Sequence, residues 1–490
     1  MSQASFHKSL PVLLRIAASA LLLLCFPSQA NAGRIEAGVF EAHDTLGSNR
    51  TPDRVNFQQQ FDTPPIVVAI PSSVGNNSAS IRITNVTTTG FDELILEPDN
   101  WDGRHLAMDT YYIAVEPGRH VLPDGTVIEA GFTDLSNVQF GSGFTGGVAS
   151  WSNVTFTAPL LSTPLILHQL QTANSETRDI ANQASRPHIT SIAQSPSTFG
   201  FQLAIERSQA NSGPFPSSER IGWIAFPDGA NGSFEDIVGS AINWSTRTSP
   251  ANIRGWDDGC FNNPHGLSAA NPIVVAKKTT RNNNDGGWLR YCSVTGTNIG
   301  LRVDEDRDQD NERNIAAGDA ERAAIVAFSQ SFHANLAAEL EVSKIRTSID
   351  DLLGNGTNFD IPGARMTYEI EVTNIGNAPP NYDSVVVTDQ LPDELDLVID
   401  DFAGPGTGPV SFVDGDPVTG LTCEFTSLSD PNDCIAFSID GVDFSYVPVD
   451  SGDGTDPAVR FIQVRPAGFM LGSGSSGSPR FSLRLQAQLR

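Results

Sequence analysis

A strongly charged stretch in the second half of the chain is the first place to look for chemistry. Residues 302–314 read RVDEDRDQDNERN, with Asp304, Asp306 and Asp308 at alternate positions. Calcium prefers oxygen ligands such as these carboxylates, but an EF-hand loop beginning at Asp304 would need Gly at its sixth position and Glu at its twelfth. The chain has Gln and Ile there, so that motif is excluded. Two interpretations remain: a calcium site of three aspartates, or a solvated acidic loop balanced by its own arginines.

The start of the chain indicates that this loop belongs to an exported protein. Lys8 and Arg15 precede an apolar run and the small-residue sequence Ala30-Asn31-Ala32, which predicts a signal peptide over residues 1–32. No later apolar run approaches the roughly 20 residues that a membrane-spanning helix needs. We therefore expect a secreted protein, extracellular or at the cell surface, with the periplasm as the alternative, and no membrane insertion.

The composition of the chain excludes some classes of binding partner and predicts disulfides. The chain has 57 acidic and 30 basic side chains and a formal net charge of -27, before the two basic residues of the signal peptide are removed. Such an excess of negative charge argues against nucleic acid or an anionic membrane as a partner. Four cysteines follow the signal peptide, in two local groups. In an oxidising compartment they predict disulfides Cys260–Cys292 and Cys423–Cys434, with pairing across the groups as the alternative.

Repeats divide the rest of the chain. A Pro followed by a short branched-aliphatic run, typical of a buried strand, recurs in VNFQQQFDTPPIVVAI (55–70), VTFTAPLLSTPLILHQL (154–170) and NPIVVAKKT (271–279). Each run is followed by two alternating segments joined by a Thr, Ser or Gly turn, which indicates a hairpin, and then by a further strand. The opening IEAG occurs twice, and the third copy lacks it. These echoes predict three tandem antiparallel β-sandwich modules over 33–124, 125–231 and 232–338, the third the most divergent.

The order of these motifs resembles that of the H-type lectins. It runs IEAG, VNF or NVTF, TPP-aliphatic, TTGF, a loop, and then YIAVE or WIAF, and the likeness covers about 300 residues in three copies. The resemblance implies a six-stranded antiparallel sandwich, trimeric in the lectins, that binds N-acetylgalactosamine or related sugars in shallow sites near protomer boundaries. Three copies in one chain then predict a pseudo-trimer within the chain, with a homo-oligomer as the alternative.

The resemblance also nominates sugar-binding residues in the first module. The loop EPDNWDGRH offers Trp101 and His105, followed by Tyr111 and Tyr112. The family's Asp has no clear match in this sequence, and Asn49 is one of the nearest polar groups. An aromatic face stacks on the apolar side of a sugar ring while polar groups bind its hydroxyls. The alternative is an exposed turn with an aromatic lid. Adjacent strand residues face opposite sides, so only one of the tyrosines can be a core residue.

The segment 339–490 has a different pattern. Its alternating strands and the sequence PGARMTYEIEVTNIGN followed by VVVTDQLP resemble the immunoglobulin-like conserved repeat of bacterial surface proteins, the family called domain of unknown function eleven. The resemblance implies a structural or spacer β-sandwich without catalytic residues.

Together these patterns predict an all-β, secreted and non-enzymatic protein, because motifs for metalloproteases, nucleophile elbows and phosphate-binding loops are missing from the sequence. The expected function is multivalent, adhesin-like binding of glycans or cell-surface polysaccharide, with no cofactor unless the acidic loop binds calcium. The alternative is a structural surface or matrix protein whose sandwiches serve as packing and spacer modules.

Overall fold

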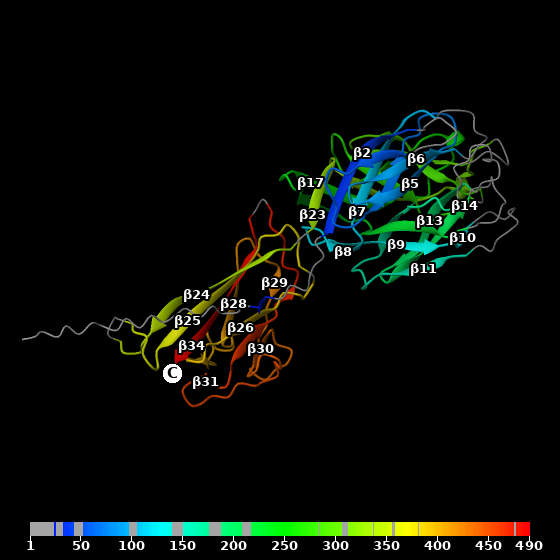
Figure 1. Cartoon of the computed structure of the whole chain (residues 1–490). Coiled ribbons are helices and arrows are strands. Elements are labelled where there is room, and N and C mark those ends of the chain that lie inside the picture. Colours follow the sequence, from blue (N-terminus) through cyan, green and yellow to red (C-terminus); the bar gives the residue numbers. More distant parts are fainter. Residues whose placement is uncertain are drawn as a thin grey trace, which may run out of the picture.

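The computed structural model describes an all-β chain. The described residues are 24–25, 33–43, 52–97, 105–139, 150–175, 188–207, 217–283, 285–305, 312–336, 338–354, 358–380, 382–474 and 477–490. They form strands with two short 3-10 turns, η2 (Trp256–Asp258) and η3 (Ala317–Asp319), and the all-β prediction is confirmed. Figure 1 shows two bodies, one carrying strands β2 to β23 and the other strands β24 to β34 together with β1.

The first body contains three units, each made of two sheets: one has four strands, and the other has three strands in the first and third units and four in the second. In the first unit the sheets have the orders β23 (Phe332–Leu336), β2 (Gly33–Ala42), β7 (Met108–Val115), β4 (Ile66–Pro71) and β3 (Asp53–Asn56), β6 (Gly90–Leu96), β5 (Ser80–Thr87).

The second and third units repeat this arrangement. In the second, the orders are β12 (Pro164–Leu170), β15 (Glu219–Pro227), β9 (Val127–Leu135), β8 (Gly118–Val121) and β10 (Val138–Gln139), β14 (Gly200–Arg207), β11 (Ser152–Thr155), with β13 (Ile189–Ser197) also on β14. In the third, they are β16 (Asn231–Glu235), β17 (Ala241–Thr248), β22 (Ala323–Phe328), β19 (Ile273–Lys278) and β18 (Phe261–Pro264), β21 (Asn298–Asp304), β20 (Trp288–Val294). The short β10 pairs with β14 in parallel.

The aliphatic runs are continuous because both of their faces are buried. In β4, Val67 and Ala69 face a core private to the first unit, whereas Ile66 and Val68 enter a second core shared by all three units. Strands β12 and β19 behave in the same way, and β4, β12 and β19 contact one another at the centre of the body. Each aliphatic side chain buried there contributes roughly 1.5–3 kcal/mol.

The glycine of each TTGF-type turn permits a close backbone approach. A Cβ at Gly90 would lie 2.2 Å from the carbonyl oxygen of Val55, and one at Gly200 would lie 2.0 Å from that of Val154. Any side chain there would push β3 from β6, or β11 from β14. The recurrence of this glycine in the first two units is therefore a requirement of packing.

The first body closes on itself through β23. This strand follows the third unit in sequence but pairs with β2, with Gly33 opposite Leu336 and Ala37 opposite Phe332. It occupies the place that β8 has beside β9 and β16 has beside β17. Likewise, β8 lies in the sheet of the second unit although the sequence boundary was predicted after residue 124.

The second body has its own hydrophobic core. One sheet has the order β24 (Leu340–Asp350), β25 (Arg365–Asn374), β34 (Arg480–Leu489), β27 (Leu395–Val398), β31 (Thr455–Asp456), with β28 (Val410–Asp414) also on β34. A second has the order β1 (Leu24–Cys25), β26 (Val387–Gln390), β32 (Phe461–Val464), β30 (Ile435–Ser438), and β29 (Leu421–Thr422) pairs with β33 (Ala467–Gly468). All of these pairings are antiparallel; the immunoglobulin-like assignment stays a prediction.

Both predicted disulfides are present. Cys260 is bonded to Cys292 in the third unit, and Cys423 is bonded to Cys434 in the second body. The Cys260–Cys292 bond joins the segment before β18 to β20, so it crosslinks the smaller sheet of the third unit.

Candidate functional site

The loop nominated for sugar binding connects β6 to β7 in the first unit. Trp101 and Asn49 lie outside the described residues. His105, at the end of the loop, is buried, and its Nδ1 donates a hydrogen bond to the carbonyl oxygen of Leu106 at 2.7 Å. A Cβ on Gly75 would lie 3.0 Å from its Nε2, so the ring packs closely on that backbone. His105 is therefore a buried residue fixed against the backbone of Gly75 and Leu106.

The two tyrosines face opposite sides of β7, as alternation requires. Tyr112 belongs to the core of the first unit, and its hydroxyl donates to Glu36 Oε1 at 2.5 Å. Burial raises the pKa of Tyr112, and the nearby Glu36 carboxylate adds to the shift. Tyr111 is half-buried, with its ring centroid 5.1 Å from that of Tyr291 in the third unit. Tyr112 is thus a core residue, and Tyr111 belongs to the contact between the first and third units.

Asp304, the first residue of the predicted calcium site, is fully buried. Its Oδ2 accepts from Arg290 at 2.8 Å, and its Oδ1 accepts from Arg313 at 3.1 Å. The backbone N–H of Ala79 donates to it as well, at 3.2 Å. Asp306 and Asp308 lie outside the described residues, and among the described ones no group of three potential metal ligands occurs. Both carboxylate oxygens of Asp304 are therefore bonded to arginines. The calcium prediction then depends on Asp306 and Asp308.

Arg290, which pairs with this carboxylate, also connects the third unit to the first. Its guanidinium is fully buried and donates to the carbonyl oxygens of Ser72 at 3.0 Å, Asn77 at 3.1 Å and Val74 at 2.7 Å. Beside it, Trp288 Nε1 donates to the carbonyl oxygen of Ala79 at 2.7 Å. The segment between β4 and β5 is thus held from the neighbouring unit.

A polar layer interrupts the shared core at the same end of the body. The strand pairings place Ile70, Gln169 and Lys277 at equivalent positions of β4, β12 and β19. Lys277 Nζ donates to Gln169 Oε1, and Gln169 Nε2 donates to the carbonyl oxygen of Ile81 at 3.0 Å. One chain of hydrogen bonds therefore connects the third, second and first units.

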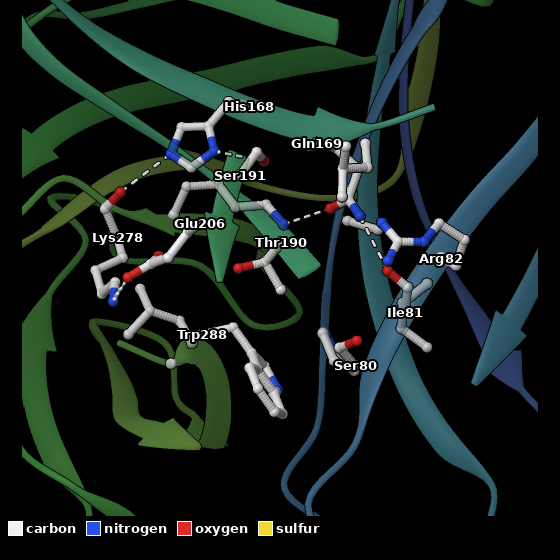
Figure 2. Close-up of a pocket in the computed structure, with 16 residues that line it drawn as sticks. Ser80, Ile81, Arg82, His168, Gln169, Thr190, Ser191, Glu206, Lys278 and Trp288 are labelled. Atoms are coloured by element: carbon white, nitrogen blue, oxygen red, sulfur yellow. Dashed lines mark hydrogen bonds and ion pairs between the residues drawn. The ribbon is translucent and has the colours of Figure 1, made fainter. Parts of the chain in front are cut away.

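A small cavity of about 40 Å3 adjoins this layer and is lined by residues of all three units. In Figure 2, the ion pair of Lys278 with Glu206 lies on one side and Arg82 on the other, with Thr190 between them. Lys278 Nζ is 2.6 Å from Glu206, and Arg82 donates to the carbonyl oxygen of Ile189 at 2.8 Å.

His168 closes the cavity wall between the second and third units. Its Nε2 donates to the carbonyl oxygen of Lys278 at 3.0 Å, so its Nδ1 accepts from the hydroxyl of Ser191 at 2.9 Å. Burial, reinforced by the charge of Lys277, lowers the pKa of His168 to about 3. The imidazole is therefore neutral at physiological pH and serves as a fixed connector.

Comparison with known proteins identifies the first unit. Residues 53–115 match the H-type lectin domain model, so the chain contains one H-type lectin domain, and this match indicates carbohydrate binding. The chain is also distantly similar to a protein named halomucin from Haloquadratum walsbyi, with 24% identity over 404 residues. That similarity covers 79% of this chain but only 4% of the relative. No solved structure matches the chain.

The matched segment contains His105 and both tyrosines, and the Trp101 loop lies inside it. The polar layer, in contrast, was missed by sequence reasoning. Its signal is the position after the aliphatic run, where IVVAI in the first copy becomes LILHQ in the second and IVVAK in the third. Gln169 and Lys277 stand at the position that Ile70 has in the first copy, so they indicate a polar centre in an otherwise apolar core.

Proposed function

We propose that the protein is a secreted carbohydrate-binding protein of adhesin type, in which the loop 98–104 of the first unit contacts the glycan. The observation that carries the proposal is the H-type lectin domain match over residues 53–115. Two fixed residues that follow the loop in sequence support the proposal: His105 is hydrogen-bonded to the backbone of Leu106, and Tyr111 contacts Tyr291. Rigid supports of this kind reduce the entropy that a binding loop loses when it closes on its ligand.

Multivalency is the second part of the proposal. The three units have corresponding sheets around one shared core, which supports a pseudo-trimer of lectin-like modules within one chain. Linked sites raise overall avidity when they can engage one surface together. The partner is then a repetitive glycan or cell-surface polysaccharide, and the second body acts as a spacer.

The disulfides support an extracellular location. Both pairs of cysteines form disulfides, which persist in oxidising compartments. Among the described residues no helix is long and apolar enough to cross a membrane.

Glycan-array binding of the secreted chain tests the proposal. We expect retention of specific glycans, and at least about a tenfold loss in Trp101→Ala, because removing a stacking ring costs more than 1.4 kcal/mol of binding. Phe199→Ala is the matched control, since Phe199 is an exposed aromatic, with 67% of its surface accessible, in the turn between β13 and β14.

Two results would count against glycan binding at this loop. If the folded protein retains no glycan, the structural alternative, in which the sandwiches are packing modules, gains support. If Trp101→Ala and Phe199→Ala bind as the unchanged chain does, the contact lies elsewhere.

A further inference from the structure

The chain carries a motif for covalent modification at several places. The sequence Asn-X-Ser/Thr, with X other than Pro, is the acceptor motif for N-linked glycosylation in secreted proteins. Among the described residues it begins at Asn76, Asn85, Asn153, Asn231 and Asn243. Further copies at Asn49 and Asn355 lie outside the described residues. On a folded chain, an enzyme must reach both the asparagine amide and the hydroxyl two residues later, so the structure distinguishes between these motifs.

Two of the motifs have a buried hydroxyl. Ser78, two residues after Asn76, is buried, and its hydroxyl donates to a backbone carbonyl oxygen. Ser245, two residues after Asn243, is also buried, and its hydroxyl donates to another backbone carbonyl oxygen. Neither hydroxyl can be reached from solvent in the folded protein, so these two motifs are poor acceptors.

The motif at Asn85 is held by hydrogen bonds. Asn85 Nδ2 donates to the carboxylate of Asp92 at 2.9 Å. The hydroxyl of Thr87 donates to the carbonyl oxygen of Gly90 at 3.1 Å. Both hydrogen bonds would have to break before a glycan could be attached, so this motif is a weaker acceptor than one whose groups are free.

The motif at Asn153 presents both groups to solvent. Asn153 and Thr155 are alternate residues of β11, so they point to the same side of the strand, and both are exposed. Val154 between them belongs to the core of the second unit. Asn153 Oδ1 accepts from Gln202 at 3.2 Å. Within the described part of the chain, Asn153 Nδ2 and the Thr155 hydroxyl make no hydrogen bond.

The motif at Asn231 has the same geometry in the third unit. Asn231 and Ser233 are alternate residues of β16, and both are exposed. Neither side chain is hydrogen-bonded to another described residue. Gly232 between them faces the body, because a Cβ there would lie 1.9 Å from Asp124 Oδ2. The amide and the hydroxyl are therefore on the open side of the strand.

We propose that the secreted protein is N-glycosylated at Asn153 and Asn231. The reaction transfers C1 of a glycan from the phosphate of a lipid-linked donor to Nδ2 of the asparagine. The C1–O bond to the donor breaks and a C1–N bond forms. The lipid phosphate leaves with the electron pair of the broken bond, and the amide loses one proton to a base of the transferase. These glycans are covalently attached, so the inference does not depend on glycan binding by the first unit.

The position of the two sites gives the glycans a physical role. Strands β11 and β16 are edge strands of their sheets, in the second and third units. An edge strand offers unpaired backbone N–H and C=O groups to other chains and is therefore a site of aggregation. A glycan on each of these strands hinders the approach of a second strand and so opposes aggregation of the secreted protein.

The third unit supplies a natural control. Asn262 is the second residue of β18, as Asn153 is of β11, and both strands have four residues and lie at the edge of a sheet. Asn262 is exposed, but Pro264 stands where the motif needs a hydroxyl. If exposure on an edge strand were sufficient, Asn262 would be modified, whereas the motif predicts that it is not.

Peptide mass spectrometry of the full secreted chain, purified from the cells that produce it naturally, tests the inference. A protease that cuts after Glu separates Asn231 from Asn243, because Glu235 lies between them. We expect attached glycans at Asn153 and Asn231 in most molecules. The peptides that contain Asn243 and Asn262 should have their unmodified masses.

A pair of variants made in the same cells tests the role of the hydroxyl. Thr155→Ala keeps Asn153 but removes the hydroxyl, so the glycan at Asn153 should be lost while that at Asn231 remains. Thr155→Ser is the matched control and should retain both. Thr155 is exposed, so either variant should fold. Unmodified masses at both asparagines, a glycan that persists at Asn153 in Thr155→Ala, or a glycan at Asn243 or Asn262 would each overturn the inference.

Discussion

Replacing Arg290 by Met is expected to weaken the contact between the first and third units and so to lower the stability of the first body. The substitution removes donors from the carbonyl oxygens of Ser72, Val74 and Asn77 and one of the two arginines that neutralise Asp304. The guanidinium is fully buried, so water cannot replace it without rearrangement. Breaking a buried ion pair by removing one partner typically costs 3–5 kcal/mol. The variant also leaves three carbonyl oxygens without their donor, whereas Arg313 still pairs with Asp304. We therefore expect a loss near the middle of that range, about 4 kcal/mol, in the free energy of unfolding of the first body.

Tryptophan fluorescence is the selective assay for this loss. All six tryptophans lie between residues 101 and 288, so the signal reports the first body and not the second. Urea unfolding of Arg290→Met should show a lower midpoint with a similar slope. Arg290→Lys keeps the charge but not the planar, multidirectional donors, and should fall between the variant and the unchanged chain.

The control is Arg220→Gln, where both partners of the ion pair are exposed, by 43% for Arg220 and 53% for Asp134. An exposed pair of this kind is worth roughly 0–1 kcal/mol. If Arg290→Met unfolds within about 1 kcal/mol of the unchanged chain, the idea that this arginine holds the two units together is refuted.

Two other predictions concern protonation and crosslinking. Because the pKa of Lys277 is lowered to about 7 in the folded state, the unfolded chain binds more protons between pH 7 and about 10, so this lysine should make stability rise as pH increases from 7 to 9. Urea midpoints at the two pH values should show that rise, and Lys277→Met should diminish it; an unchanged pH dependence in the variant would contradict the assignment. Replacing Cys260 and Cys292 by Ser should cost about 3.7 kcal/mol, from the entropy of a loop spanning 32 residues, seen as a lower urea midpoint by fluorescence. Replacing Cys423 and Cys434 instead should leave the fluorescence transition in place, and a shift of similar size would show that the two bodies unfold together.

Local patterns in the sequence predicted much of the fold. Alternation and aliphatic runs indicated the strands, and the two local pairs of cysteines gave both disulfides. Alternation also predicted that one of Tyr111 and Tyr112 is a core residue, and the hydrogen bond to Glu36 shows that it is Tyr112. These features depend on neighbours in sequence or on a period of two, which a single chain displays.

Contacts between distant segments could not be predicted from the sequence. The burial of Asp304 within a run of charges depends on Arg290 across the hairpin and on Ala79 in another unit. The pairing of β23 with β2 joins segments about 300 residues apart, and no local signal names the partner of an alternating strand. His105 appeared to be a surface loop residue because its anchor is backbone, which has no signature in composition.

The pairing of β2 with β23 also has a mechanical meaning. Gly33 and Leu336 lie directly opposite each other, so tension applied across the two ends of the first body pulls on adjacent points of one strand pair. Such loading opens the pair one hydrogen bond at a time, as a zipper opens, and it does not shear all bonds at once. Since cleavage is predicted before Gly33, load on a protein held through the proposed glycan site would enter this pair from the second body at Leu336, and β23 would separate from β2 from that end.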